Sequence, residues 1–308
     1  MKSILVIGSL NMDFVVNVDK MPVAGETRLG RNVELIPGGK GANQACAIGK
    51  LGGKADMLGA VGKDSYADMQ LNSLRNAGVS VSSIIKRENA NTGIALITVN
   101  HAGENSIIVV PGANHTLTAR DIDQHIELIR QHDIIILQME IPLETVLYAA
   151  KCAKEAGKTV ILDPAPAPED FPSELYQYID IMKPNETELS ILTHSTDATH
   201  DLEKATNKLK EFGIQCVLVS LGANGVFIND SDGKLYHIPG VPVRAVDSTA
   251  AGDTFTAAVA VCLAKGNTIV EAARYANIAA ALAVTKKGAQ SSIPTYEEVA
   301  QMQAELSF

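Results

Sequence analysis

The chain of 308 residues contains no tryptophan, and its four cysteines are far apart and form no CxxC pair. A disulfide scaffold is therefore excluded, and each cysteine is interpreted as a small buried thiol because its neighbours are apolar or alanine-rich. The seven histidines form no HExxH motif or other paired-ligand spacing, so we expect no structural zinc. The cysteines are Cys46, Cys152, Cys216 and Cys262.

The sequence also lacks long apolar runs and an excess of positive charge. No stretch reaches membrane-spanning length, and Met1–Ser3 leads into the short apolar run Ile4–Ile7 without the pattern of a signal peptide. We therefore expect a cytoplasmic protein without a membrane partner. The net charge of −9, from 26 basic and 35 acidic residues, argues against binding to nucleic acid. A local basic site for the phosphates of a small ligand is still compatible with this charge.

Composition and periodicity are typical of one globular α/β domain over residues 1–308, with 46% hydrophobic and 20% charged residues and no repeat or evident linker. From about residue 110 to 230, apolar strands alternate with amphipathic helices. This rhythm predicts a three-layer, doubly wound, mostly parallel sheet covered on both faces. The expected strands are Ile4–Ser9, Ala55–Val61, Ile134–Gln138, Thr159–Leu162, Ile179–Met182 and Val217–Leu221. The expected helices are Ala42–Leu51, Asp64–Asn76, Leu143–Glu155, Leu202–Phe212, Thr254–Ala264 and a last one from Thr268 to about Thr285.

Two stretches, at about 12–36 and 92–110, contain β patterns without intervening helices. Phe14–Val18 and Thr27–Ile36 alternate polar and apolar residues, and Thr92–Asn100 with Ser106–Val110 reads as a hairpin. These segments predict a small separate sheet beside the main one. That sheet could be a lid over a ligand, an interface between two copies of the chain, or both.

The strongest motif is Asp247–Phe255, in which small residues followed by Gly-Asp open directly into a helix. Helix N-termini expose unpaired amides and a partial positive charge, and the amides of Ala250, Ala251 and Gly252 would be unobstructed. Asp253 could simply favour the helix dipole. However, an anion site beside a carboxylate, with a second acid at Asp247, is the arrangement that phosphoryl transfer needs.

A second motif, Pro37–Gln44, combines glycines that let a ligand approach the backbone with the donors Lys40 and Asn43. It is not a Walker A loop, because Glu34 and Gly41 occupy positions that need glycine and Ser or Thr. No GxGxxG follows the first strand either, which argues against a dinucleotide fingerprint.

Three further segments are weaker signals. Asn11-Met12-Asp13 follows the first strand, where α/β proteins bind ligands, although such a sequence is more often only a turn. Asn185–Glu188 could cap a helix or hold the waters around Mg²⁺. Ser220–Gly225 could be a tight turn or a loop against a nucleotide.

Together, the motifs Gly38–Gln44 and Asp247–Phe255, in this order and separation, resemble the two signatures of the ribokinase-like (PfkB) family of carbohydrate kinases. The resemblance runs from about Ile4 to Pro294 and implies an α/β sandwich with a small β lid that often forms a dimer clasp. It implies an ATP-dependent sugar kinase, with ribose as the expected acceptor and a homodimer as the expected assembly.

The resemblance also assigns residues. The base would be Asp253, next to Ala250, Ala251 and Gly252, and the sugar would be held by Asn11, Asp13, Gly39, Lys40, Gly41, Asn43 and Glu140. The nucleotide would meet Asn185, Ser220, Gly222, Ala223, Asn224, Gly225, Gly252 and Asn277. Mg²⁺ would accompany ATP, held through water by Glu188, and a monovalent cation such as K⁺ would be bound by Asp247, Thr249, Ala283, Lys286, Gly288 and Ser292, mostly through main-chain carbonyls.

Two departures from the family pattern leave this chemistry intact. Many relatives carry His where Asn277 stands, and Met12 fills a variable position. The alternatives are a kinase for another acceptor (deoxyribose, a hexose or a nucleoside such as adenosine) and a regulator that binds sugar or nucleotide without catalysis.

Overall fold

The computed structural model describes residues 1–195 and 197–306, and within them the chain forms a nine-stranded sheet and a separate four-stranded sheet. The order of the large sheet is β13-β12-β11-β10-β9-β8-β1-β4-β5, and its neighbouring strands are parallel except for the antiparallel pairs β11–β12 and β12–β13 at one edge. The mostly parallel α/β sheet predicted from the sequence is confirmed. Its strands are β1 (Ile4–Ile7), β4 (Ala55–Gly62), β5 (Ile84–Arg87), β8 (Ile134–Leu137), β9 (Thr159–Leu162), β10 (Ile181–Met182), β11 (Cys216–Ser220), β12 (Val226–Asn229) and β13 (Leu235–Ile238).

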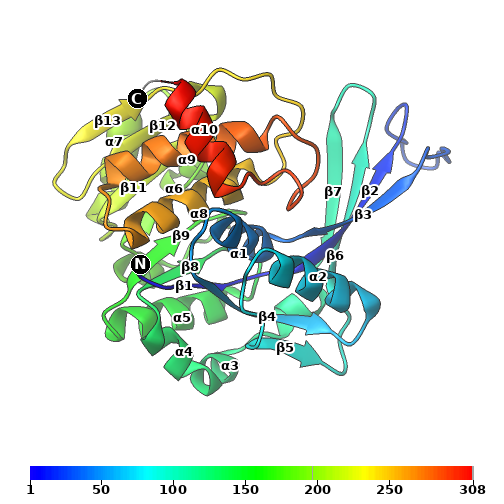
Figure 1. Cartoon of the computed structure of the whole chain (residues 1–308), viewed down its shortest axis with the longest axis horizontal. Helices are drawn as coiled ribbons and strands as arrows, with labels where there is room; N and C mark the ends of the chain where they lie inside the picture. Colours follow the sequence, from blue (N-terminus) through cyan, green and yellow to red (C-terminus); the bar gives the residue numbers. More distant parts are fainter. Residues whose placement is uncertain (196, 307–308) are drawn as a thin grey trace.

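Helices cover both faces of the large sheet (Figure 1). The sheet residues alternate between two apolar clusters: Ile4 and Val6 face one side, whereas Leu5 and Ile7 face the other. The first cluster includes residues of α1 (Lys40–Lys50), α2 (Ser65–Asn76), α8 (Ala251–Ala264), α9 (Ile269–Ala283) and α10 (Tyr296–Glu305). The second includes residues of α3 (Ala119–Gln124), α4 (Ile126–Gln131), α5 (Leu143–Glu155), α6 (Glu186–Thr193) and α7 (Leu202–Glu211). Three short 3₁₀ turns complete the described elements, η1 (Gly112–Thr116), η2 (Ser173–Tyr178) and η3 (Gly222–Asn224).

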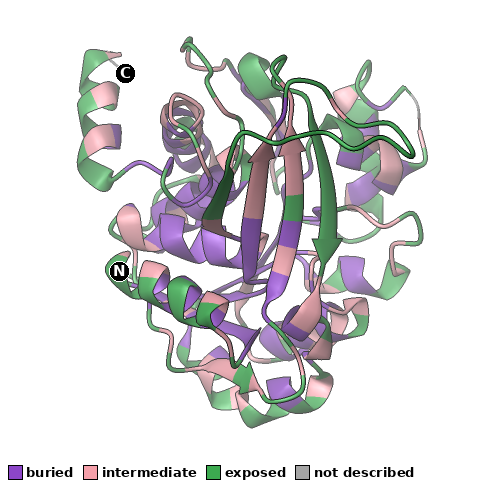
Figure 2. Cartoon of the chain, turned by 90° about the vertical axis from the view of Figure 1, so that its right-hand side faces the viewer, coloured by how far each residue is buried: buried purple, intermediate pink, exposed green. Residues whose placement is uncertain are grey.

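The small sheet has the order β3-β2-β6-β7 and stands away from the large one as the predicted lid (Figure 1). Its strands are β2 (Asn11–Asn17), β3 (Val33–Gly38), β6 (Gly93–Val99) and β7 (Asn105–Val110). The base of β2 is buried, whereas β7 is exposed along its whole length (Figure 2). Because β2 follows β1 after three residues, the base of the lid lies at the carboxyl edge of the large sheet.

The structure corrects two details of the expected elements. Thr27–Ile36 is not one strand, because pairing begins only at Val33 and residues 27–32 form no strand. The helix expected to begin at Thr254 begins at Ala251, directly after Ala250 takes a left-handed conformation with φ of 60°. The four cysteines are buried and free, as predicted. No described helix is both long enough and apolar enough to cross a membrane.

Candidate active site

The residues predicted to bind ligands gather where the parallel strands end, between the base of the lid and the start of α8. This is the edge at which open α/β sheets bind their ligands. Asn11 and Asp13 arrive from β1 through the lid strand β2, and Glu140 follows β8. Lys40 begins α1, and Asp253 lies in the first turn of α8.

The start of α8 presents main-chain donors without partners. Among the described residues, the amides of Gly252 and Asp253 donate to no acceptor, whereas the Ala251 amide donates to the Ser248 carbonyl at 3.3 Å. Ala250 has its left-handed backbone here, and Gly252 is exposed. Unpaired amides at the positive end of a helix dipole form a site for an anion such as a phosphate group.

The Asp253 carboxylate is 7% exposed and faces the loop predicted to hold the sugar. Its Oδ2 accepts a hydrogen bond from Asn43 Nδ2 at 2.9 Å, and its Oδ1 accepts one from Gln44 Nε2 at 3.0 Å. Burial raises the pKa of Asp253, an effect that the positive charge of Lys40 opposes and the carboxylate of Asp163 reinforces. A carboxyl group with a raised pKa is the better proton acceptor once it is ionised.

The glycines of the sugar loop are required by close contacts. Gly39 has φ of 86° and caps α1, and a Cβ on it would lie 2.6 Å from the Asn11 main-chain nitrogen. A Cβ on Gly38 would lie 2.2 Å from Asp13 Oδ2. Larger residues at these positions would push the loop away from the carboxylate of Asp13.

The charged groups around this loop change one another's ionisation. Burial, followed by the charges of Glu140 and Asp253, raises the pKa of Asp13 to about 7. Burial alone would lower the pKa of Lys40, but nearby carboxylates, Asp253 first and then Glu140, hold it above its ordinary value. Lys40 is therefore a permanent cation among acids.

Two more predicted sugar residues are fixed by their neighbours. Glu140 Oε2 accepts hydrogen bonds from Ser9 Oγ at 2.5 Å and from the Lys40 amide at 3.1 Å. Asn11 Oδ1 accepts from Asn114 Nδ2 at 2.8 Å, so the amide of Asn11 has a defined orientation. Asn43 Oδ1, in contrast, is buried without a hydrogen-bond partner in the described chain, which leaves an acceptor for a ligand hydroxyl.

The residues predicted to meet the nucleotide lie on neighbouring elements. Asn185 and Ser220 form a parallel bridge at the ends of β10 and β11. The segment Gly222–Asn224 is the turn η3, and Gly222 and Gly225 have positive φ values of 55° and 92°. Asn277 donates to the Pro239 carbonyl at 3.2 Å, which ties α9 to the chain that follows β13. Ala223 and Asn224 belong to η3 itself.

The Asn185–Glu188 segment forms a helix cap. Asn185 Oδ1 accepts from the Glu188 amide, and Glu188 Oε2 accepts from the Asn185 amide, both at 2.8 Å. Burial raises the pKa of Glu188, and the positive charge of Lys183 opposes this increase. The cap occupies only one carboxylate oxygen, so Oε1 is left for a water molecule or an ion.

Two of the residues predicted to bind a monovalent cation, Thr249 and Gly288, contact Asp247. Asp247 Oδ1 accepts from the Thr249 amide at 2.9 Å, and Oδ2 accepts from the Gly288 amide at 2.9 Å. Burial alone would raise the pKa of Asp247, but the hydrogen bonds from Thr249 and Gly288 lower it. Ala283 ends α9, and its carbonyl accepts a hydrogen bond from the Lys286 amide at 3.2 Å. Ser292 is buried.

Main-chain oxygens in this loop fit a hard cation. Among the described residues, the carbonyls of Lys286, Gly288 and Ser292, like that of Thr249, accept no main-chain hydrogen bond. Carbonyl oxygens with free lone pairs can replace the hydration shell of K⁺, and one nearby carboxylate balances its charge.

Sequence reasoning missed a group of buried polar residues below the site. They are Gln44, Gln138, Asp163 and Lys183. Asp163 directly follows the apolar strand β9, and Lys183 directly follows β10. Gln44 Nε2 lies 3.0 Å from both Asp253 Oδ1 and Asp163 Oδ2, and Gln138 Nε2 donates to Gln44 Oε1 at 2.6 Å. A charged residue just after a buried apolar strand was the available signal.

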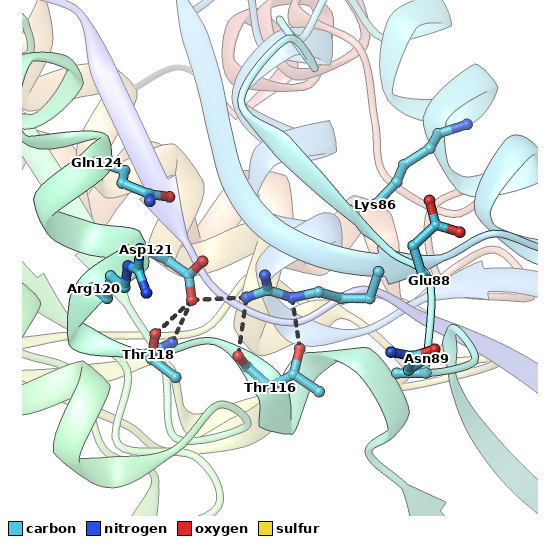
Figure 3. Close-up of a pocket in the computed structure, with 10 residues that line it drawn as sticks. Lys86, Glu88, Asn89, Thr116, Thr118, Arg120, Asp121 and Gln124 are labelled. Carbon is cyan, nitrogen blue, oxygen red and sulfur yellow. Dashed lines mark hydrogen bonds and ion pairs between the residues drawn. The ribbon is translucent and has the colours of Figure 1, made fainter.

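A surface pocket of about 620 Å³ lies elsewhere, beside the edge strand β5 (Figure 3). Several of its charged groups have partners among the described residues: Arg87 pairs with Asp121 at 2.7 Å, and Lys86 pairs with Asp68 at 3.2 Å. Thr118 also donates to Asp121. Arg120 also lines the pocket and forms no ion pair among the described residues. None of the residues predicted to bind a ligand lines this pocket.

An α/β sheet with a β lid, and a buried acid beside unpaired amides, define a phosphotransferase of small molecules. The family model described as pfkB family carbohydrate kinase matches residues 1–296, so the chain belongs to the PfkB family of carbohydrate kinases. It is a ribokinase-family sugar kinase.

Individual relatives agree over nearly their whole length. The ribokinase of Haemophilus influenzae is 41% identical over 298 residues, covering 96% of this chain and 97% of the relative. A structure of Arabidopsis thaliana ribokinase complexed with ribose and ATP superposes with a TM-score of 0.91 at 36% identity, covering 98% of each chain. A deoxyribokinase of Salmonella typhi is 37% identical over 296 residues, covering 96% of each chain.

Proposed function

We propose that the chain transfers the γ-phosphoryl group of ATP to the primary hydroxyl of ribose, with Asp253 as the base. The observation that carries this proposal is the position of the Asp253 carboxylate in the first turn of α8, where the amides of Gly252 and Asp253 have no partner among the described residues. The carboxylate accepts the proton of the hydroxyl whose oxygen attacks phosphorus in line. These amides, with that of Ala250 beside them, stabilise charge on the transferred group, whereas the Ala251 amide already donates to the Ser248 carbonyl.

The sugar lies against the lid base in this proposal. The ionised Asp13 carboxylate, which accepts no hydrogen bond from the described chain, accepts two neighbouring hydroxyls. Asn43 Oδ1 accepts a third, and Asn11, Lys40 and the main chain at Gly39 and Gly41 supply donors. Glu140 holds the first turn of α1 in place through the Lys40 amide.

Ribose is favoured because relatives named ribokinase match the chain over nearly its full length. 2-Deoxyribose is the second candidate, because the Salmonella typhi relative is named deoxyribokinase. The two sugars differ by one hydroxyl, and a site built to bond that hydroxyl rejects the sugar that lacks it.

Cations complete the proposed site. Glu188 would hold Mg²⁺ through water, and the bound ion would balance charge on the ATP phosphates. The carbonyls of Thr249, Lys286, Gly288 and Ser292 and the Asp247 carboxylate would hold K⁺, whose charge would steady the loop that precedes α8. The nucleotide lies along Asn185, the Ser220–Gly225 turn and Asn277.

The test is an ADP-release assay with ribose, 2-deoxyribose, fructose and adenosine, each with and without K⁺. We expect the highest kcat/KM with ribose, and Asp253→Asn lowers kcat roughly 10²–10⁴-fold while the protein stays folded. A folded Asp253→Asn variant with wild-type kinetics would show that another group is the base. A preference for 2-deoxyribose would select the second candidate.

A further inference from the structure

A buried ion pair below the site has no part in the chemistry described so far. Asp163 follows β9 and Lys183 follows β10, and they are 1% and 4% exposed. Lys183 Nζ lies 3.0 Å from Asp163 Oδ1. Removing charged groups from water costs free energy, so a buried ion pair often adds little to the stability of the fold.

The ammonium of Lys183 is incompletely partnered. Its contact with Asp163 Oδ1 does not have hydrogen-bond geometry, since that oxygen has no hydrogen-bond partner among the described residues. No other described acceptor receives a hydrogen bond from Lys183 Nζ. An ammonium carries three N–H donors, so Lys183 keeps donors for a ligand besides its ion pair with Asp163.

Lys183 is also next to the unpaired amides of α8. Its Nζ is 3.3 Å from the position that a Cβ on Gly252 would take, and Gly252 itself is exposed. The absence of a side chain at residue 252 thus leaves the ammonium beside the anion site. A charged donor next to main-chain amides would reinforce their hold on a phosphate oxygen.

The second oxygen of Asp163 connects the pair to the proposed base. Asp163 Oδ2 accepts from Gln44 Nε2 at 3.0 Å and from Thr256 Oγ1 of α8 at 3.2 Å. The same Gln44 nitrogen is 3.0 Å from Asp253 Oδ1. Asp163 is therefore placed to hold both Lys183 and, through Gln44, the base.

We propose that Lys183 is a further phosphate-contacting residue, and that Asp163 is a positioning residue that orients it. Resting on the proposed function, this assigns to Lys183 a bond to an oxygen of the phosphoryl group that is transferred. The bond strengthens as negative charge gathers on that group, so its loss lowers kcat more than sugar binding.

The test compares Lys183→Met with Lys154→Met. Lys154 pairs with Asp180 at 2.6 Å before the start of β10, at the opposite edge of the sheet, so it controls for the loss of an ion pair. We expect Lys183→Met to lower kcat roughly 10²–10³-fold relative to this control. Calorimetry should show unchanged ribose and AMP affinity, but binding of a non-hydrolysable ATP analogue weakened about tenfold or more.

A double variant separates contact from neutralisation. If Lys183 serves only to neutralise Asp163, then Asp163→Asn combined with Lys183→Met restores kcat, and the proposal is wrong. If Lys183 contacts phosphate, the double variant stays as slow as Lys183→Met. Should Lys183→Met fail to fold because Asp163 is left buried without a partner, the double variant is measured in its place. Equal weakening of the ATP analogue and AMP, or a kcat matching Lys154→Met, would also overturn the proposal. Failure of the proposed function is distinct, because the wild type would then release no ADP with ribose.

Discussion

Asn43 donates its side-chain amide to Asp253 Oδ2 at 2.9 Å, although the two residues are 210 positions apart in the chain. The contact joins the first turns of α1 and α8, the elements that carry the proposed sugar loop and the proposed base. The hydrogen bond favours the ionised form of Asp253 over the protonated form, because a negatively charged carboxylate accepts a hydrogen bond from an amide N–H more strongly.

Asn43→Ala should therefore shift the pH profile of catalysis. Hydrogen bonds from Asn43 and Gln44 lower the pKa of Asp253 against the effect of burial, so losing one raises that pKa further. The base must be ionised to act, so the acidic limb of kcat/KM moves to higher pH. Lys40, Asp163 and Asp13 also face Asp253 and are unchanged in the variant.

The measurement is kcat/KM for ribose from about pH 5 to 9, in wild type and variant. Asn229→Ala is the matched control. Asn229 lies on β12, is buried like Asn43, and donates its side-chain amide to Thr206 Oγ1 of α7 at 3.0 Å. An acidic limb that stays in place in Asn43→Ala, as in the control, would contradict the assignment of Asp253.

Asp13 should make the free protein less stable as the pH rises. Its pKa is about 7 in the folded chain against an ordinary value of 3.8, so the folded state binds the proton more tightly than the unfolded state. The stability from this group is fully present below about pH 4 and is lost as the pH rises through 7. Asp13→Asn should flatten this part of the dependence of the unfolding temperature on pH.

Sugar binding should show the opposite trend with pH. The ionised carboxylate is the better acceptor for hydroxyls, so ribose affinity rises as the pH passes through about 7. Asp13→Asn should lose about tenfold or more in affinity at alkaline pH and show little pH dependence, measured by calorimetry. A variant with wild-type affinity at all pH values would remove Asp13 from the sugar site.

The cation site predicts a stabilisation that is specific for K⁺. A ligand that binds only the folded state raises its stability by an amount that grows with ligand concentration. KCl should therefore raise the unfolding temperature more than an equal concentration of tetramethylammonium chloride, and Asp247→Ala should abolish the difference. Asp232→Ala, which removes an acid paired only with Lys234 in a surface turn, should retain it.

Local patterns were enough to predict much of the fold and part of the site. The helix Leu143–Glu155 has the predicted bounds because its periodicity and its ends are both encoded nearby. Asp253 could be found because small residues before a helix are a local signal of an anion site. The alternation in Thr27–Ile36 misled, because a strand also needs a partner, and residues 27–32 have none in the small sheet.

The remaining site residues depend on contacts that no local pattern encodes. Asp163 and Lys183 are 20 positions apart and meet only because β9 and β10 are neighbours in the sheet. The rule that placed Asn11 and Asp13, a polar residue after a buried strand, applies equally to these two. Their connection to Asp253 runs through Gln44, whose role follows from distances alone.

The lid has an apolar outer face that we expect to join two copies of the chain. In register, Leu35 neighbours Phe14, Phe14 neighbours Leu96, and Leu96 neighbours Ile108, so the row lies on one face, opposite to Asp13. Leu35, Leu96 and Ile108 are 41%, 43% and 62% exposed. Large exposed apolar patches mark interaction sites, and an unpartnered lid strand such as β7 offers a second surface for the same contact.

Ile108→Lys should therefore convert a dimer into a monomer, because each half of a symmetric interface would have to bury an ammonium group. Sedimentation velocity at a range of concentrations measures this, with Leu235→Lys as a control: Leu235 is 37% exposed but lies on β13, far along the other sheet. If wild type and Ile108→Lys sediment alike, the outer lid face is not the dimer interface. If the variant is monomeric, its KM for ribose should rise more than its KM for ATP. The lid carries Asp13, a proposed sugar ligand, whereas the proposed phosphate site at the start of α8 lies outside the lid.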